Sequence, residues 1–283
     1  MLKSTVKYLF FLDIDGTLLD SKYKTNYLGL KRKIESLQAR QKFAFCLNSN
    51  RSIQDLLPVA KQFGIKGPLI CENGLFAYLP KSNREVLLTD KKMLNMLISV
   101  KNSFKKWILQ YGQELKLKII YRKTDTVKLM NDSGAKKNFE NSIFVFDNKF
   151  RKYTISAHVR RFTSGNMNKD LNSLKKLQKF ITEKVKILGL SDSIEIGSSD
   201  TFGNLLVYSK LISKRTGVKH LINNYYRGYK VIAIGDESSD ARMVQDIGEF
   251  WTLNNATAEV KNVANKVAIE SHTKGVNELL LNL

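Results

Sequence analysis

Short apolar runs alternate with amphipathic segments over the first third of the chain. Nearly continuous apolar runs occupy Tyr8–Leu12, 42–47 and Leu69–Cys71, and each has the length of one strand. This pattern is typical of strands that are buried on both faces of a parallel sheet. Over 26–40 and about 52–63, apolar residues return every three or four positions, which predicts two helices. Repeated strand–helix units predict a parallel sheet with right-handed crossovers.

The pattern changes over residues 81–209. Two long amphipathic stretches predict helices at 90–111 and 169–188. Short apolar or alternating stretches predict strands at 117–121, 143–147, 153–159, 193–196 and 205–208. A polar stretch at 130–141 predicts a surface loop. Two helices among several strands, without strict alternation, predict an inserted α+β domain.

Alternation resumes near residue 210. Helices are expected at 214–225, near 243, at 256–264 and at 275–281, and strands at 230–234, 250–253 and 266–269. The predicted fold class is therefore α/β. Residues 1–80 and 210–283 form a parallel-sheet core, and residues 81–209 form an α+β insert.

Length and composition limit the kind of protein. The chain has 283 residues with 43% hydrophobic and 26% charged residues, which are the values of an ordinary soluble globular protein long enough for two domains. It has no apolar stretch of membrane-spanning length and no pattern of a signal peptide. Its two cysteines, Cys46 and Cys71, lie in apolar segments, where buried thiols and a disulfide are both compatible with the sequence. We expect a cytoplasmic protein without a membrane partner, with free thiols.

The formal net charge of +21 comes from lysines and arginines scattered along the whole chain. A positive field attracts small phosphorylated molecules, and it attracts nucleic acid without sequence preference. The alternative, solvated helix faces in a lysine-rich protein, explains the same charge. The sequence has neither zinc-finger spacing nor an RNA-binding signature, so we expect no specific nucleic-acid partner.

Two carboxylates follow the first predicted strand. Asp13 and Asp15 flank Ile14 and are followed by Gly16. Alternate residues of an extended chain point the same way, so both carboxylates face one spot at the carboxyl end of the strand, where open α/β sheets bind ligands. Neighbouring carboxylates repel each other unless a cation or a shared proton compensates, and Mg²⁺ suits such oxygen ligands. The alternative is an acidic turn at a strand end, and the motif favours the functional interpretation.

Four segments in order resemble the motifs of the haloacid dehalogenase superfamily of phosphohydrolases: DIDGTLLD, NSNR, a lysine in SKRTGVKHL, and GDESSDARM. LICENGLFAYLP and the closing LNNATAEVKNVANKVAIESHTKGVNELL resemble the branch with a large α/β cap. That branch contains Cof-type hydrolases and phosphatases of sucrose, trehalose and mannosylglycerate phosphates. The resemblance covers nearly all of the core and little of residues 81–209. It implies a Rossmann-like core and a cap that selects the substrate and closes over it.

The resemblance assigns catalytic roles to three residues. Asp13 would be the nucleophile that forms an aspartyl phosphate, and Asp15 would protonate the leaving alcohol and then deprotonate water. Lys214 would neutralise charge during transfer, with Lys210 as the alternative, since Arg215 stands where the family usually has glycine.

The resemblance also implies a Mg²⁺ site and a phosphate site. The expected metal ligands are Asp13, Asp15 through its backbone carbonyl, Asp236 and Asp240, with Ser239 replacing the usual asparagine. Residues expected to bind phosphate or substrate are Gly16, Ser49, Asn50, Arg51 and Asn73.

Further polar residues have alternative interpretations. Asn255 belongs to the closing motif and is expected to support the loop of Asp236. His158, Arg160 and Arg161 either reach a second anionic group or form an exposed basic strand end. His272, like His220, is expected to be an ordinary helix or loop residue.

The sequence therefore predicts a Mg²⁺-dependent phosphomonoesterase that hydrolyses a small phosphorylated metabolite, a sugar phosphate, through an aspartyl phosphate on Asp13. One alternative is a phosphomutase or phosphotransferase on the same fold. Another is a catalytically silent, basic binding protein. The sequence allows a monomer or a dimer.

Overall fold

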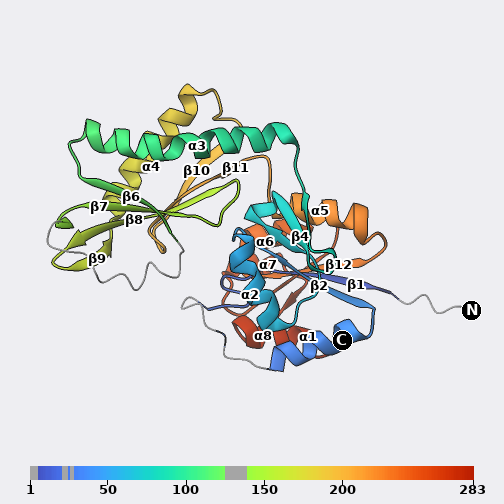
Figure 1. The fold of residues 1–283 in the computed structure, drawn as a ribbon. Coiled ribbons are helices and arrows are strands. Elements are labelled where there is room, and N and C mark those ends of the chain that lie inside the picture. The colour runs from blue at the N-terminus through green and yellow to red at the C-terminus, as the bar shows by residue number, and fades with distance from the viewer. Residues whose placement is uncertain (1–5, 21–24, 26–28, 125–138) are drawn as a thin grey trace, which may run out of the picture. The chain divides into compact units, whose positions relative to one another are not determined.

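The computed structural model describes residues 6–20, 25, 29–124 and 139–283, in two compact units (Figure 1). Unit 1 comprises Met1–Leu88 and Ile212–Leu283, and unit 2 comprises Thr89–Leu211. The sequence pattern places the first boundary near residue 81. In the structure the chain divides after Leu88, because a hairpin absent from the predicted elements adds two strands to the sheet of unit 1.

Unit 1 is built on an eight-stranded sheet with the order β14-β13-β12-β1-β2-β3-β4-β5. The six strands from β14 to β3 are parallel, and the hairpin of β4 and β5 is antiparallel. The strands are β1 (Tyr8–Leu12), β2 (Phe43–Asn48), β3 (Leu69–Cys71), β4 (Phe76–Leu79), β5 (Arg84–Leu87), β12 (Lys230–Gly235), β13 (Glu249–Thr252) and β14 (Lys266–Val267).

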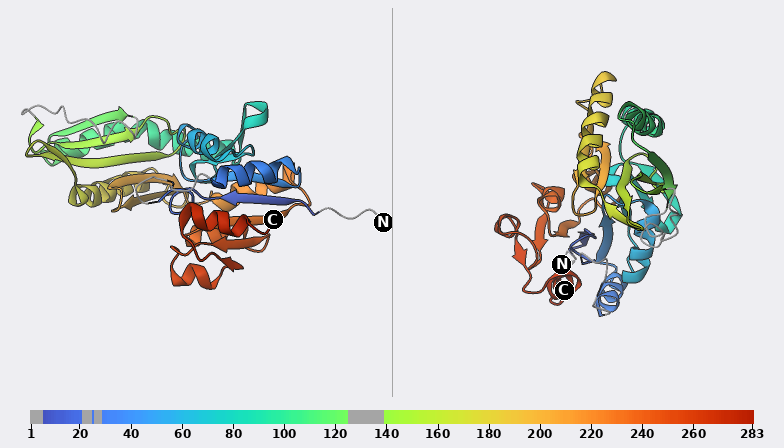
Figure 2. Two further views of the ribbon diagram at one scale, coloured as in Figure 1. Left: turned by 90° about the horizontal axis from the view of Figure 1, so that it is seen from below. Right: turned by 90° about the vertical axis from the view of Figure 1, so that its left-hand side faces the viewer.

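Helices lie on both sides of this sheet (Figures 1 and 2). They are α1 (Gly29–Ala39), α2 (Ile53–Phe63), α5 (Lys214–Tyr225), α6 (Ser238–Val244), α7 (Ala258–Asn262) and α8 (His272–Leu280), with short 3₁₀ turns η1 (Glu72–Gly74) and η2 (Pro80–Ser82). Leu9 and Phe11 of β1 pack in one core with residues of α5, α6 and α7. Phe10 stacks on Phe45, with ring centroids 4.8 Å apart. All four residues are fully buried, so the apolar run of β1 contributes to a core on each face.

Unit 2 has a six-stranded sheet with the order β10-β11-β8-β7-β6, and β9 pairs with β8. Its strands are β6 (Ile119–Thr124), β7 (Ile143–Asn148), β8 (Ile155–Thr163), β9 (Asn166–Lys169), β10 (Ile194–Ser199) and β11 (Asn204–Ser209). β6 and β7 are parallel, and the other pairs are antiparallel. The helices α3 (Lys91–Glu114) and α4 (Leu171–Ile187) pack on each other and on these strands.

The predicted α/β class with a parallel-sheet core is confirmed. Most predicted helices and strands are present within a few residues of the expected bounds. Residues 130–138 of the predicted polar loop, and 26–28 at the start of the first predicted helix, lie outside the described residues.

Candidate active site

Three neighbouring parallel strands, β12, β1 and β2, deliver the first residues of the site. Asp13 follows β1, Ser49 follows β2 and Asp236 follows β12. Parallel strands end at the same edge of a sheet, so these residues meet although more than 200 positions separate Asp13 from Asp236. The backbone N–H of Asp13 donates to the carbonyl of Ile234 at 3.0 Å, which fixes Asp13 beside β12.

A buried lysine links two carboxylates. Lys214 is the first residue of α5, and its Nζ donates to Oδ1 of Asp13 and, at 2.8 Å, to Oδ1 of Asp240. The side chains of Asp13, Asp240 and Lys214 are 6%, 1% and 11% exposed, so water screens these ion pairs little. Burial alone would lower the pKa of Lys214, but the two carboxylates reverse this and raise it. Lys214 therefore stays protonated and positively charged. Lys210, the alternative lysine, pairs instead with Glu195 at 3.6 Å in unit 2.

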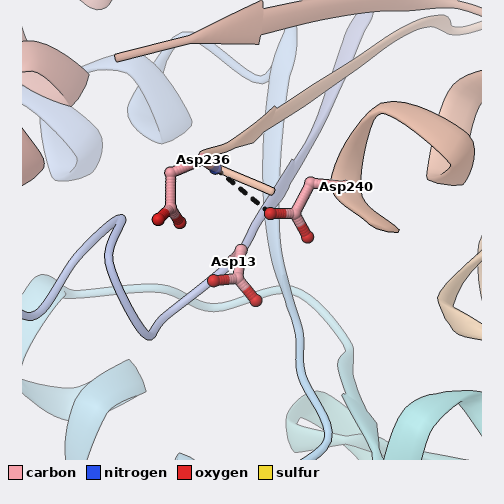
Figure 3. A group of neighbouring side chains, drawn as sticks. All are labelled: Asp13, Asp236 and Asp240. Carbon is pink, nitrogen blue, oxygen red and sulfur yellow. Dashed lines mark hydrogen bonds between the residues drawn. The ribbon is translucent and has the colours of Figure 1, made fainter. Parts of the chain in front are cut away.

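Three carboxylates converge in Figure 3: Asp13, Asp236 and Asp240. One oxygen of each lies within 4.8 Å of the others. Burial, the charge of Asp240 and, to a smaller extent, that of Asp15 raise the pKa of Asp13, while Lys214 opposes the rise. Burial also raises the pKa of Asp236, to about 6. Both shifts come chiefly from burial, and repulsion by Asp240 adds to each of them.

Asp240 is already engaged by the protein. Its Oδ2 accepts the backbone N–H groups of Asp236 and Glu237, each at 3.1 Å, and the first of these bonds is drawn in Figure 3. Its Oδ1 accepts from Lys214. Asp240 therefore shapes the loop after β12, whereas the carboxylate of Asp236 accepts a hydrogen bond from the hydroxyl of Thr17, at 3.0 Å, and from no other described residue.

Gly16 lies directly against the Asp236 carboxylate of this cluster. Its φ is +83°, which favours glycine, and a Cβ at this position would lie 2.1 Å from Oδ2 of Asp236. Its carbonyl accepts from Nδ2 of Asn255 at 2.8 Å and lies 2.9 Å from Nδ1 of His272. The His272 ring must donate from Nδ1 here, because a carbonyl can only accept. The closing segment therefore holds the loop of Asp15 and Gly16.

Asp15 lies outside the carboxylate cluster. Both its oxygens accept from the guanidinium of Arg51: Nε donates to Oδ2 at 2.9 Å and Nη2 to Oδ1. The Asp15 side chain is 42% exposed and that of Arg51 is 21% exposed, so a ligand can reach this ion pair. A metal contact through the backbone carbonyl of Asp15 stays a prediction.

The loop after β2 is joined to the loop after β3. Ser49 is 2% exposed, and its carbonyl accepts the N–H of Asn73 at 3.2 Å. The carbonyl of Arg51 accepts the N–H of Glu72 at 3.0 Å. These bonds hold the Ser49–Asn50–Arg51 segment next to Asn73, whose φ is +63°, and phosphate binding by these residues stays a prediction.

Several residues of the site were not identified from the sequence. Thr17 and Asn48 carried no role there, and His272, expected to be a helix or loop residue, begins α8 and also contacts the Gly16 carbonyl. Asn48 is fully buried, and its Nδ2 donates to the carbonyl of Lys214 at 3.0 Å, which fixes the start of α5. The only available signal was position, since Thr17 follows the DxDG motif and Asn48 ends β2.

The basic residues of β8 in unit 2 largely form hydrogen bonds and ion pairs within the protein itself. Arg161 pairs with Asp170 at 2.7 Å. The guanidinium of Arg160 donates to the carbonyls of Phe202 and Gly203, each at 2.9 Å. Burial and, secondarily, Arg160 lower the pKa of His158 to about 4, so its ring is neutral at pH 7. This arrangement gives no support to a second anionic site on these three residues.

The sequence model of haloacid dehalogenase-like hydrolases matches residues 10–280. The chain belongs to this family. The predicted superfamily and enzyme class, a haloacid dehalogenase-type hydrolase, are thereby confirmed.

Related proteins agree with this assignment. Over 54 residues the chain is 39% identical to kanosamine-6-phosphate phosphatase of Bacillus subtilis, a match that spans 19% of the chain and 19% of that protein. A Thermotoga maritima protein has a similar structure, with a TM-score of 0.66 at 19% identity over 98% of this chain and 97% of the other. A haloacid dehalogenase-like hydrolase of Bacteroides thetaiotaomicron gives 0.65 at 18% identity, over 98% and 99% of the two chains. At these identities the structures establish the fold alone. No helix among the described residues is long and apolar enough to cross a membrane.

Proposed function

We propose that the protein is a Mg²⁺-dependent phosphomonoesterase that forms an aspartyl phosphate on Asp13. The observation that carries the proposal is the formal charge of the largely buried cluster. Asp13, Asp236 and Asp240 contribute three negative charges, and Lys214 contributes one positive charge, which leaves the charge that one divalent cation neutralises.

Mg²⁺ fits the donors present. Asp13 and Asp236 would hold it directly, because their oxygens have fewer protein partners than those of Asp240. The missing side chain of Gly16 leaves space beside Asp236. When bound, the ion would supply positive charge to the phosphoryl oxygens.

In the first step, an oxygen of Asp13 attacks phosphorus and the bond to the leaving alcohol breaks. Asp15 gives its proton to that alcohol. Lys214 holds Asp13 in place and offsets the charge on the phosphoryl group, and the hydroxyl of Ser49 donates to a phosphoryl oxygen. In the second step, water attacks phosphorus and gives a proton to Asp15. The bond to Asp13 breaks, and inorganic phosphate leaves.

The ion pair of Asp15 and Arg51 has to open before Asp15 can act as an acid. Arg51 donates to both oxygens of Asp15, whereas the first step needs one of these oxygens to carry a proton for the leaving alcohol. A phosphate dianion competes for the guanidinium, so substrate binding would release Asp15 for its role as an acid. Arg51 would thereby couple substrate binding to acid catalysis.

The proposed substrate is a small phosphorylated metabolite, a sugar phosphate. Support comes from the matching segment of kanosamine-6-phosphate phosphatase. Substrate selection is assigned to unit 2, as the family resemblance implies. Phosphate release in the absence of an acceptor sugar distinguishes hydrolysis from mutase or transferase activity.

The proposal is tested by phosphate release over a panel of sugar phosphates, with Mg²⁺ or with EDTA. We expect turnover by the native protein that needs Mg²⁺ and is lost in Asp13→Asn. Asp246→Asn removes a carboxylate whose side chain is 78% exposed and should leave turnover unchanged. Turnover that survives in Asp13→Asn, or that EDTA does not affect, would contradict the proposal.

A further inference from the structure

The basic charge of the protein is concentrated in unit 2. This unit includes 24 lysines and arginines but only 11 aspartates and glutamates, a net charge of +13. Unit 1 is longer and includes 23 basic and 15 acidic residues, a net charge of +8. The scatter of charge along the sequence therefore hides an uneven distribution in the folded protein.

Much of this charge lies on the two helices of unit 2. The buried residues of α3 and α4 repeat at helical spacing and pack inward, so the opposite stripe of each helix is exposed. Exposed lysines on these stripes outnumber exposed glutamates by eight to two. We call the set the lysine face, and it comprises Lys91, Lys92, Lys105, Lys106, Lys175, Lys176, Lys179 and Lys186.

Neighbouring acids do not neutralise the lysine face. Lys175 pairs with Asp200 at 2.6 Å. The other seven lysines form no ion pair with a described residue. Like charges on adjacent turns of a helix repel one another and destabilise it. An anionic partner would reduce this repulsion between the lysines.

Exposed aliphatic side chains accompany these lysines. Leu109 is 38% exposed beside Lys105 and Lys106, and at the end of α4 Ile187 is 77% exposed and Leu188 is 47% exposed. The exposed positions of α3 and α4 include no aromatic ring on which a nucleic-acid base could stack. Cationic and aliphatic groups together match the interface of an anionic bilayer, where headgroups attract lysines and acyl chains accept aliphatic side chains.

We propose that the lysine face docks the protein on the surface of an anionic phospholipid bilayer. The contact is peripheral: the lysines meet lipid phosphates while Leu109 and Ile187 enter the outer edge of the apolar layer. This surface is separate from the carboxylate cluster of unit 1, so membrane contact and phosphate-ester hydrolysis are properties of different residues.

The test is co-sedimentation of the full-length protein with vesicles of phosphatidylcholine containing phosphatidylglycerol, against vesicles of phosphatidylcholine alone. We expect binding only to the anionic vesicles, at about 0.1 M salt, and its loss near 1 M salt. Lys105→Glu/Lys106→Glu/Lys176→Glu should weaken binding about 100-fold or more, since each lysine near an anionic surface contributes about 1 kcal/mol.

A second triple variant controls for net charge. Lys66→Glu/Lys81→Glu/Lys219→Glu makes the same charge change at exposed positions of unit 1 and should alter binding by no more than about threefold. Melting temperatures check that all variants are folded. Equal losses in the two triple variants, or no binding of the native protein to anionic vesicles, would overturn the proposal.

The aliphatic residues distinguish a bilayer from a polynucleotide. Leu109→Ser/Ile187→Ser should weaken vesicle binding about tenfold and leave binding to duplex DNA unchanged. If this variant binds vesicles as the native protein does, while duplex DNA binds the lysine face more tightly than vesicles do, the lipid assignment is wrong.

Discussion

At the scale of single residues, the site depends on one buried ammonium group. Lys214 contacts Asp13 and Asp240, and no other basic side chain takes part in the ion pairs recorded for these two carboxylates. A cation between two buried carboxylates compensates for their loss of hydration and their mutual repulsion. Its position at the start of α5 is secured by Asn48.

Lys214→Met should therefore destabilise the protein as well as inactivate it. Loss of one partner from a buried ion pair costs about 3 kcal/mol or more, because the carboxylates stay buried without compensation. Denaturant unfolding in EDTA measures the loss, and added Mg²⁺ should recover part of it. Lys210→Met breaks an ion pair whose side chains are more than 40% exposed and should cost less than about 1 kcal/mol. Equal losses in the two variants would exclude the buried role.

Asp236 makes the metal site sensitive to pH. Its pKa is raised from 3.8 to about 6, so in the absence of metal its ionisation favours the unfolded chain. Its contribution to stability is therefore lost as pH rises from 4 to 6, and this part of the pH dependence should be missing in Asp236→Asn. Mg²⁺ needs the ionised form, so its apparent affinity should fall about tenfold per pH unit below 6. Calorimetric Mg²⁺ titration at pH 5 and 7 measures this, and equal affinities would contradict it.

At the scale of elements, the loop after β1 determines how much space is left beside the Asp236 carboxylate. Its Gly16 has a φ of +83° and touches the Asp236 carboxylate, while Gly228 has a φ of +81° with open space around its Cβ position. Alanine at either position strains the backbone, but only at position 16 does the new methyl group displace a site carboxylate.

Gly16→Ala should consequently lower Mg²⁺-dependent turnover by about 100-fold or more, and Gly228→Ala should leave turnover unchanged. Both variants should lose about 1–2 kcal/mol of stability through backbone strain. Comparable activity in the two variants would show that the space beside Asp236 has no role in the reaction.

Asn255, which follows β13, and His272, the first residue of α8, support the same loop. His272 and Asn255 both donate to the Gly16 carbonyl, and Oδ1 of Asn255 accepts the N–H of His272 at 3.1 Å. His272→Leu removes the ring donor and should reduce kcat about tenfold with little change in KM, since the loop positions Asp15. His272→Asn keeps a donor and suits the local φ of +52°, so it should restore most of the activity. A large rise in KM, or no rescue, would argue for a different role.

The elements themselves were predictable where the hydrophobic pattern was strong. β1, β2 and β12 were found because they are buried on both faces. β4 and β5 were missed: β5 (REVL) has three exposed residues of four, and Pro80 interrupts the hairpin. β9 (NMNK) is polar and pairs only with β8. Such strands form because a neighbour provides the backbone partners, and a local pattern does not contain this information.

At the scale of the whole molecule, the sequence predicted those site residues that directly follow the strands of the parallel sheet. The motif spacing and the parallel sheet bring together Asp13, Ser49 and Asp236, and the spacing within SKRTGVKHL already favoured Lys214 over Lys210. Hydrogen bonds from Thr17 to Asp236 and from His272 to Gly16 join residues more than 200 positions apart. No local periodicity signals contacts of that kind.

Mass spectrometry of the protein, quenched in acid during turnover of a sugar phosphate, is the most direct test of Asp13 as the nucleophile. We expect one added phosphoryl group on the peptide that contains Asp13, present with Mg²⁺ and absent with EDTA or in Asp13→Asn. A phosphoryl group on any other residue, or undiminished turnover by Asp13→Asn, would show that Asp13 is not the nucleophile.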